Sequence, residues 1–129
     1  VLQLWPAWVV LEQGGNDGRR GWRPVVTLAN LHHIIARLRE RHIHVLLAGI
    51  ALPPPAPPAY ARAFQRVFGV LARRHRLPLL PFLYQDLLLQ MHRHPALLQA
   101  DGMHATPRGN RIVAATVWRY LQPLLRKMP

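Results

Sequence analysis

The sequence contains no cysteine and no serine. Without cysteine, disulfides, thiolate metal sites and cysteine nucleophiles are excluded, while the redox compartment of the protein stays undecided. Without serine, none of these 129 residues can act as a serine nucleophile. Carboxylates are also scarce, because Asp and Glu together number five, and this limits the acidic groups available for a catalytic or metal-binding site.

Long apolar segments are absent as well. No uninterrupted apolar run approaches the roughly 20 residues needed to cross a bilayer, so we expect no membrane span. The first residues, Val1 to Pro6, have neither a basic start nor a small-residue cleavage site, and no signal peptide is visible. The chain does not start with Met, which leaves open a signal in a preceding segment.

Basic residues are abundant. The formal net charge is +12, and nearly all of it comes from arginine, since Lys127 is the only lysine. Such a charge suggests nucleic-acid binding. Six of the arginines, however, lie where two predicted helices end, and cations there complement the helix dipole. Aromatic residues that could stack on bases do not alternate with them. We therefore expect charged solvated faces and no nucleic-acid partner, with a basic binding module as an alternative. The six arginines are Arg37, Arg39, Arg41, Arg73, Arg74 and Arg76.

Three short apolar runs predict buried strands, at residues 8–11, 45–49 and 79–82. The first run ends in two glycines, which predict a turn, and the third is short enough for an edge strand. Helices are predicted between these runs. Near-continuous apolar strands separated by helices are typical of a parallel sheet that is covered on both faces.

Helical spacing of apolar residues predicts the helices. Pro24 suits the first turn of a helix that continues to about Arg41, and a second stripe falls at residues 60–71. Thr106 can cap, and Pro107 can open, a final helix. The apolar residues of the three stripes are Leu28, Leu31, Ile35 and Leu38; Tyr60, Phe64, Val67, Phe68 and Leu71; and Ile112, Ala115, Val117, Trp118, Leu121 and Leu125.

The remaining segments predict irregular structure. The proline-rich residues 52–58 form a stiff loop after a strand, because prolines lack the backbone donors that a helix or central strand needs. Residues 83–100 are less regular. Neither an internal repeat nor a domain boundary is visible, so residues 1–129 are expected to form part of a single domain.

Two tight segments draw attention as a candidate site, Gly14–Asp17 after the first strand and Asp101–His104 before the last helix. In parallel α/β sheets, sites form at the C-terminal ends of strands, where both segments are expected. Gly, Asn and Asp are ordinary turn residues, so either segment alone is also explained as a turn. Their joint occurrence favours a functional site.

The residue types in these segments suit acyl-transfer chemistry. Asp101 and His104 are three residues apart, which on an irregular turn can bring the carboxylate to the imidazole. A carboxylate on one ring nitrogen fixes the tautomer and stabilises the imidazolium that forms when the other nitrogen takes a proton. Asn16 follows two glycines at a strand end and can aim its amide at a developing oxyanion, an interaction worth about 2.7–4 kcal/mol.

These segments resemble a known family. The stretch from Trp8 to Gly18 resembles the third block of SGNH (GDSL-type) ester hydrolases, whose Asn donates to the oxyanion hole. Asp101–His104 resembles their last block, which supplies the Asp and His of the triad. Between them, Leu52-Pro53-Pro54 and residues 78–83 resemble the thioesterase I, lysophospholipase and arylesterase branch.

The resemblance implies a function and its residues. The reaction is hydrolysis of carboxylic esters or thioesters through an acyl-serine intermediate, and the partner is a small-molecule acyl ester or thioester. His104 acts as general base and then acid, Asp101 orients it, and Asn16 joins the oxyanion hole. Gly15 and Asp17 beside it contact the substrate. No metal or organic cofactor is implied, and the location implied is the periplasm or the exterior of the cell.

The resemblance also implies a fold, a flavodoxin-like three-layer α/β sandwich with a parallel sheet. The family's first block, Gly-Asp-Ser-(Leu), carries the nucleophile, and it would precede Val1. Residues 1–129 are then the C-terminal portion of one SGNH hydrolase domain whose N-terminal strands are missing, and the strand at residues 8–11 is left with an unpaired edge. An alternative is a truncated, non-catalytic remnant.

The sequence departs from the family at several positions. Thr27, Thr106 and Thr116 are poor substitutes for the serine, because two fall in predicted helices and Thr106 is better explained as a cap. Ala105 stands where the family usually has proline. The proline-rich loop at residues 52–58 replaces an Asn-Tyr-Gly-like segment near the acyl site of relatives, which bears on substrate preference.

The other histidines predict surface positions. His42 and His44, like His92 and His94, have i, i+2 spacing that could place two imidazoles on one side of a strand. With no cysteine and few acids nearby, a complete metal site is hard to assemble, so none is expected. The adjacent pair at residues 32 and 33 falls on neighbouring faces of a helix and is also expected at the surface.

Overall fold

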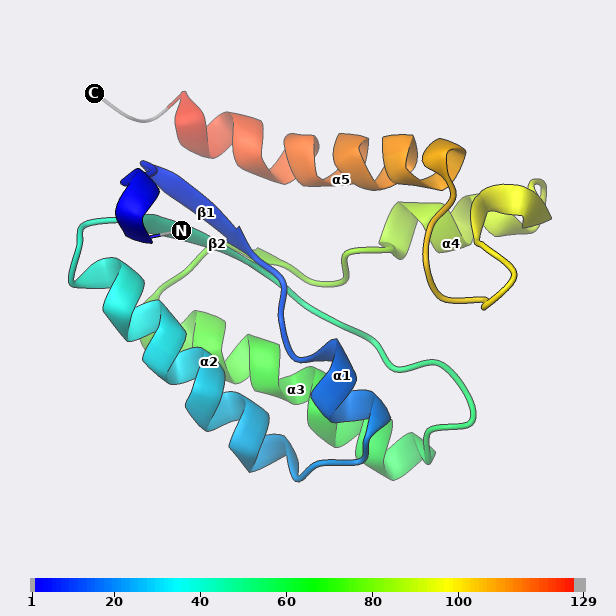
Figure 1. The fold of residues 1–129 in the computed structure, drawn as a ribbon, viewed down its shortest axis with the longest axis horizontal. Helices are drawn as coiled ribbons and strands as arrows, with labels where there is room; N and C mark the ends of the chain where they lie inside the picture. Colours follow the sequence, from blue (N-terminus) through cyan, green and yellow to red (C-terminus); the bar gives the residue numbers. More distant parts are fainter. Residues whose placement is uncertain (1, 127–129) are drawn as a thin grey trace. The chain divides into compact units, whose positions relative to one another are not determined.

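The computed structural model describes residues 2–126, and only the backbone of Pro95. Two compact units make up the chain, residues 1–82 and residues 83–129. The three strands of the described chain belong to the first unit, and the second contains helices joined by irregular segments. Figure 1 shows these elements coloured along the chain.

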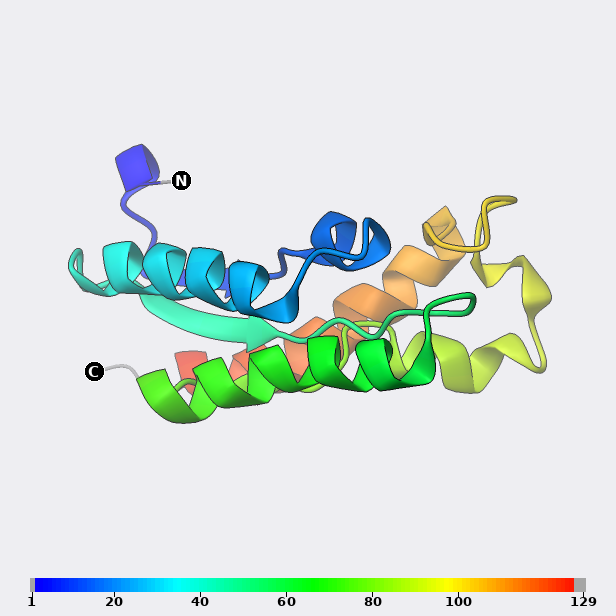
Figure 2. The ribbon, with the colours of Figure 1, turned by 90° about the horizontal axis from the view of Figure 1, so that it is seen from below.

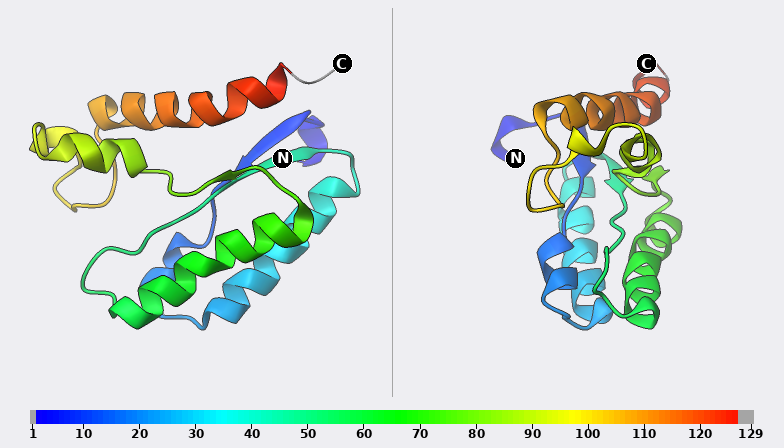
Figure 3. Two further views of the ribbon diagram at one scale, coloured as in Figure 1. Left: turned by 180° about the vertical axis from the view of Figure 1, so that it is seen from behind. Right: turned by 90° about the vertical axis from the view of Figure 1, so that its right-hand side faces the viewer.

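The first unit is a three-stranded parallel sheet with two long helices along one face. Its elements are η1 Leu2–Leu4, β1 Trp8–Leu11, α1 Gly15–Arg19, α2 Pro24–Arg39, β2 His44–Ala48, α3 Pro58–His75 and β3 Leu79–Leu80. β2 lies between β1 and β3, with Trp8 opposite His44 and Leu47 opposite Leu79. Helices α2 and α3 are the crossovers that parallel neighbours require. They lie side by side on the same face of the sheet (Figures 1 and 3), and Figure 2 shows β2 running between them.

The predicted parallel sheet with flanking helices is confirmed, and the bounds differ by a few residues. β3 is at the sheet edge, as predicted, but it has only two residues. Pro58, expected in the loop, is instead the first residue of α3, where its missing N–H has no helical partner to lose. The predicted turn after β1 is followed at once by the short helix α1.

The core of this unit contains the apolar stripes that helical spacing predicted. Its fully enclosed side chains come from α2, α3 and the sheet, and Leu28 and Tyr60 are partly buried at its margin. Thr27 also lies inside, with 1% of its surface exposed, which the apolar pattern did not indicate. Side chains that contribute to this core include Leu31, Ile35, Leu38, Val45, Leu47, Phe64, Val67, Phe68 and Leu71.

The second unit contains α4 Gln85–Met91, η2 Pro95–Leu97 and α5 Pro107–Leu125. Helix α4 occupies a stretch that was expected to be irregular. Thr106 caps α5 as predicted, because its hydroxyl oxygen accepts a hydrogen bond from the backbone N–H of Gly109 at 3.2 Å. Leu87 and Leu97 form a small core with Ala105 between these helices.

The apolar stripe predicted for α5 is only partly buried. Trp118 is 51% exposed, and Ala115 and Leu125 are exposed as well. Thr116 is the enclosed residue of this helix turn, and its hydroxyl donates to Asp86 of α4 at 2.7 Å. Arg119 also binds this carboxylate, at 2.8 Å. A polar pair between α4 and α5 therefore occupies a place where the sequence pattern predicts apolar contact.

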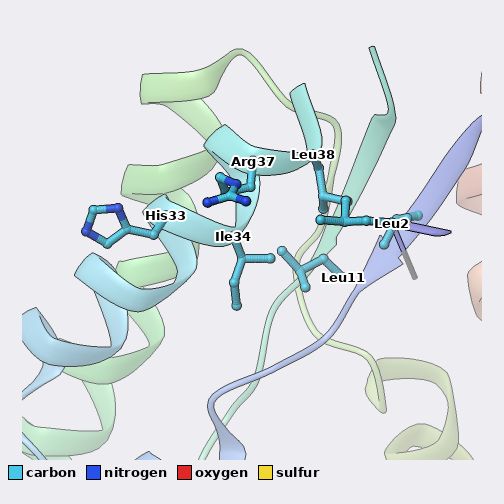
Figure 4. Close-up of a pocket in the computed structure, with 7 residues that line it drawn as sticks. Leu2, Leu11, His33, Ile34, Arg37 and Leu38 are labelled. Atoms are coloured by element: carbon cyan, nitrogen blue, oxygen red, sulfur yellow. The ribbon is translucent and has the colours of Figure 1, made fainter. Parts of the chain in front are cut away.

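The outer edge of β1 is unpaired within residues 2–126, because β1 has β2 as its single strand neighbour there. Beside this edge, β1 and α2 border an apolar hollow of about 340 Å³ (Figure 4). Leu2, Leu11, Ile34 and Leu38 point into it. Among the residues that the structure describes, no helix is both long and apolar enough to cross a membrane.

An open edge beside an apolar hollow predicts self-association, because unpaired strand edges template pairing with other chains. We expect the 129-residue chain to form concentration-dependent oligomers and Val10→Lys to reduce them, since Val10 is exposed on this edge strand. Light scattering after size exclusion measures the effect. Val25→Lys, on exposed α2 surface away from the edge, is the matched control. A wild-type chain that stays monomeric, with a sharp cooperative unfolding transition, would contradict the prediction.

The bond between Thr116 and Asp86 gives a second prediction. It lowers the pKa of Asp86, with the Arg119 guanidinium adding to the effect while desolvation opposes it. Thr116→Val keeps the side-chain shape and removes the donor, so the free energy of unfolding should fall by about 1–2 kcal/mol at neutral pH.

A carboxylate with a lowered pKa stabilises the fold above its unfolded-state pKa, and this contribution is lost as the pH falls through its folded-state pKa. The difference between Thr116→Val and its parent should therefore shrink below about pH 4. Urea unfolding in the Val10→Lys background, at neutral and acidic pH, measures it. An equal difference at both pH values would argue against the carboxylate as the partner that matters.

Candidate active site

The segment after β1 turns sharply at Gly14. This residue has φ 105°, a left-handed conformation that disfavours any side chain, and a Cβ here would lie 2.8 Å from the Thr27 side chain. The carbonyl of Gly14 accepts the backbone N–H of Gly18 at 3.1 Å, which starts α1. Residues 15–17 are thereby held at the C-terminal end of β1, where the sequence predicted them.

Asn16 and its neighbours have different environments. The side chain of Asn16 is exposed and makes no hydrogen bond with any residue of the described chain, so its amide is available as a donor. Asp17 is half-buried and accepts a hydrogen bond from the Thr27 hydroxyl at 3.0 Å. Gly15 packs near the side chain of Ile50. The backbone around Asn16 is therefore anchored while its amide remains free.

The loop after β2 lies against this segment. A Cβ on Gly18 would come within 2.6 Å of Leu52 and 2.9 Å of Phe64, so only glycine allows α1 to approach so closely. Tyr60, in the first turn of α3, donates its hydroxyl proton to the Trp22 carbonyl at 2.8 Å. Burial and the nearby Asp17 raise the pKa of Tyr60. The start of the proline-rich loop thus packs against α1, the helix that contains Asn16.

The second unit holds the acid and the imidazole in direct contact. The Oδ2 atom of Asp101 lies 2.5 Å from Nδ1 of His104. The Oδ1 atom accepts the backbone N–H groups of Met103 at 2.9 Å and of His104 at 3.0 Å. The hydrogen bond from the His104 ring, with those two backbone bonds, holds the pKa of Asp101 well below its usual range. The contact that the three-residue spacing predicted is present in the structure.

This turn leaves one ring nitrogen of His104 free. Nδ1 is engaged by the carboxylate, and no residue of the described chain bonds to Nε2. The side chains of His104 and Asp101 are 65% and 43% exposed. The His104 carbonyl accepts the N–H of Gln99 at 2.8 Å, and Leu98 bridges to Ala105, so the loop is fixed at its base. A fixed imidazole with a free Nε2 can accept and return a proton.

The candidate residues thus fall into two groups. Asp101 and His104 are together in the second unit, and Gly15, Asn16 and Asp17 are together in the first. The bond from Thr27 to Asp17 joins positions ten residues apart, and apolar periodicity gave no signal for it.

The threonines do not provide a free nucleophile. Thr27 binds Asp17, Thr106 caps α5, and Thr116 binds Asp86, so each hydroxyl already has a partner. This agrees with the expectation that threonine is a poor substitute for the family's serine.

The remaining histidines differ in part from expectation. His33, His44, His92 and His94 are exposed, as predicted. His32 is instead half-buried, with its Nδ1 atom 2.8 Å from Nε2 of His75. Within residues 2–126, no group of three or more His, Cys, Asp or Glu side chains is arranged to hold a metal ion.

Comparison with known proteins identifies the class. The model of the GDSL-like lipase/acylhydrolase family matches residues 1–112. The chain therefore belongs to the GDSL-like lipase/acylhydrolase family. It is 38% identical over 120 residues to esterase TesA of Pseudomonas aeruginosa, covering 93% of this chain and 58% of that protein.

A further relative and a solved structure agree. An Escherichia coli K12 protein, named as thioesterase 1, protease 1 and lysophospholipase, is 34% identical over 125 residues, covering 97% of this chain and 58% of that one. A crystal structure of TesA superposes with a TM-score of 0.84 at 36% identity, covering 95% of this chain and 66% of the other. The predicted family and α/β fold are confirmed. The chain spans about 58% of the length of the curated relatives that it matches.

The Asp101 turn predicts a distinctive pH response. Because the pKa of Asp101 is lowered, its carboxylate should stay ionised and keep its hydrogen bonds to the loop through the pH range in which an ordinary Asp titrates. The loop should be released only at more acidic pH. Hydrogen exchange of the Met103 and His104 amides measures this. Their protection should persist as the pH falls through about 4, where an ordinary Asp titrates, and be lost only at clearly more acidic pH. Asp101→Asn should weaken the protection at every pH at which the parent carboxylate is ionised, and unchanged protection in that variant would contradict the role of the carboxylate.

Proposed function

We propose that this chain contributes the acid–base and oxyanion-binding groups of an ester hydrolase, acting on carboxylic esters or thioesters by a Ser-His-Asp mechanism. The observation that carries the proposal is the Asp101–His104 contact, in which Nδ1 is bound and Nε2 is free. The serine is not among these 129 residues, so a segment outside them supplies it. On this proposal, residues 1–129 are the C-terminal portion of a single SGNH hydrolase domain.

Each residue has a defined part in the reaction. Nε2 of His104 removes the serine proton as the serine oxygen attacks the substrate carbonyl. Asp101 keeps the ring oriented and stabilises the imidazolium. Asn16 donates its amide proton to the oxyanion of the tetrahedral intermediate. His104 then protonates the departing alcohol or thiol, and a water molecule, activated by the same ring, releases the acid from the acyl-serine. Gly15 and Asp17 contact the substrate beside Asn16.

The substrate class follows from the relatives' printed names. These name an esterase, an arylesterase, and a thioesterase that is also a lysophospholipase. We accordingly propose a small acyl-CoA, lysophospholipid or aryl ester substrate, and no metal or organic cofactor. The proline-rich loop beside Gly18 contributes to the choice of acyl group, since Leu52 packs against that segment. From the family resemblance of the sequence, we also propose a location in the periplasm or outside the cell.

The absence of serine supports a second candidate, a truncated remnant without activity. The two differ in whether the Asp101–His104 pair and Asn16 still work when a nucleophile is supplied. A chimera decides this. It joins the part of the Pseudomonas aeruginosa esterase that precedes its matched region to this chain, so that the relative provides the serine and this chain provides the other groups.

The activity prediction has three parts. The 129-residue chain alone should not hydrolyse p-nitrophenyl esters, while the chimera should. In the chimera, His104→Ala should abolish most turnover. Asn16→Ala should lower kcat by about 10²–10³, with little change in KM, because its hydrogen bond strengthens mainly in the transition state. Steady-state kinetics measure these values, with His94→Ala, an exposed histidine of the same unit, as the matched control. A folded chimera with no activity, or one fully active without His104, would refute the proposal.

A further inference from the structure

One row of arginines on α3 has no carboxylate partner within the described chain. Arg62, Arg66 and Arg73 are exposed and lie at i, i+4 and i+11, which places them on one side of the helix. None of them forms an ion pair with a carboxylate in residues 2–126. Helix α3, which runs across the lower part of Figure 2, contains no Asp or Glu.

The helix dipole does not account for this row. A cation near the C-terminus of a helix is favourable, which explains Arg73 and the neighbouring Arg74. Arg62 and Arg66, however, lie in the first half of α3, far from the last turn in which the dipole favours a cation. They are also four residues apart, a spacing at which like charges destabilise a helix. The row therefore carries an electrostatic cost that an external anion would relieve.

The row borders a groove that is open to solvent. Together with Gln65, Phe68, Gly69, Leu79 and Pro81, the three arginines line a hollow of about 440 Å³. Gly69 lies between Arg66 and Arg73 on the helix, and a Cβ there would meet only the Arg73 guanidinium, at 3.5 Å. The lack of a side chain at Gly69 thus leaves open space beside the Arg73 guanidinium, at a helix position between Arg66 and Arg73. We call this surface the arginine groove.

The chemistry of the groove favours phosphate groups beside apolar chains. Guanidinium groups bind phosphate oxygens through paired hydrogen bonds. The groove wall at Leu79 and Pro81 is apolar, and the adjacent Val70 is 38% exposed on α3. The aromatic side chain of the groove, Phe68, is 1% exposed and cannot stack on a nucleic-acid base. A cluster of arginines on an amphipathic helix is typical of attachment to an anionic bilayer surface.

We propose that the arginine groove binds the phosphate groups of an anionic phospholipid surface and holds the protein against it. The net charge of +12 supports such attachment. Binding involves no covalent step and does not depend on ester hydrolysis. Failure of this proposal therefore leaves the proposed activity intact, and the reverse also holds.

Vesicle flotation of the 129-residue chain tests the proposal. The chain should bind vesicles that contain phosphatidylglycerol and not vesicles of phosphatidylcholine alone, and high salt should release it. Replacing Arg62, Arg66 and Arg73 by Gln should lower the partition coefficient by roughly a hundredfold, from about fivefold for each arginine. The matched triple replaces Arg93, Arg108 and Arg111, which are exposed arginines of the second unit without a carboxylate partner in the described chain. It loses the same charge and should bind nearly as the wild type does.

A second pair of variants avoids any doubt about folding. Gly69→Glu places a carboxylate between Arg66 and Arg73, and Gly69→Gln places a neutral side chain of the same shape there. Both improve helix propensity, so neither should unfold α3. Gly69→Glu should reduce vesicle binding tenfold or more relative to Gly69→Gln. Equal binding by these two variants, equal losses in the two arginine triples, or no preference for phosphatidylglycerol would overturn the proposal. The same pattern of losses with a single-stranded oligonucleotide but not with vesicles would overturn it in favour of nucleic acid.

Discussion

The parallel pairing of β1 with β2 is the constraint on which the first unit depends. Parallel neighbours cannot be joined by a tight turn, so the chain must cross over the sheet, and α2 makes that crossover. The same parallel pairing places the C-terminal ends of β1 and β2 next to each other at one end of the sheet. Because of this, α1 after the Gly14 turn packs against the loop after β2, with Gly15 near Ile50 and Gly18 near Leu52, and Asn16 lies on this short helix. The position of Asn16 thus follows from backbone hydrogen bonds made several residues away.

In the second unit, the local structure of the candidate site depends on a single carboxylate, that of Asp101. Asp101 binds the imidazole of His104 with one oxygen and two backbone N–H groups with the other. These bonds lie on an exposed turn, where burial contributes little and the hydrogen-bond geometry sets the ring orientation. The result is a histidine with one nitrogen fixed and one free, the arrangement that general acid–base catalysis needs. The chain belongs to the GDSL-like lipase/acylhydrolase family, and on the proposed function this pair acts on a serine that lies outside the 129 residues.

How much of the structure could be predicted from the sequence depends on how far apart along the chain the contacting residues lie. The α2 and α3 stripes were predictable because burial there repeats with the helix period, and Asp101 and His104 meet within one turn. Contacts between distant positions gave no periodic signal. The bond from Thr116 to Asp86 joins residues 30 apart, and it buries a threonine where apolar neighbours were expected to be enclosed. The contact between the rings of His32 and His75 joins residues that are even further apart, 43 positions along the chain. Helix α4 was missed because its residues alone lack a clear stripe.

The central claim is that His104 and Asp101 activate a serine supplied by a segment outside these residues. Labelling with a fluorophosphonate, followed by mass spectrometry, tests it most directly, because the reagent modifies a serine only when that serine is activated. In the chimera with the Pseudomonas aeruginosa segment, the account predicts one labelled serine in that segment, loss of labelling in His104→Ala, and no label on the 129-residue chain alone. Labelling that is as fast in His104→Ala as in the parent chimera, or a labelled residue within the 129 residues, would contradict the account.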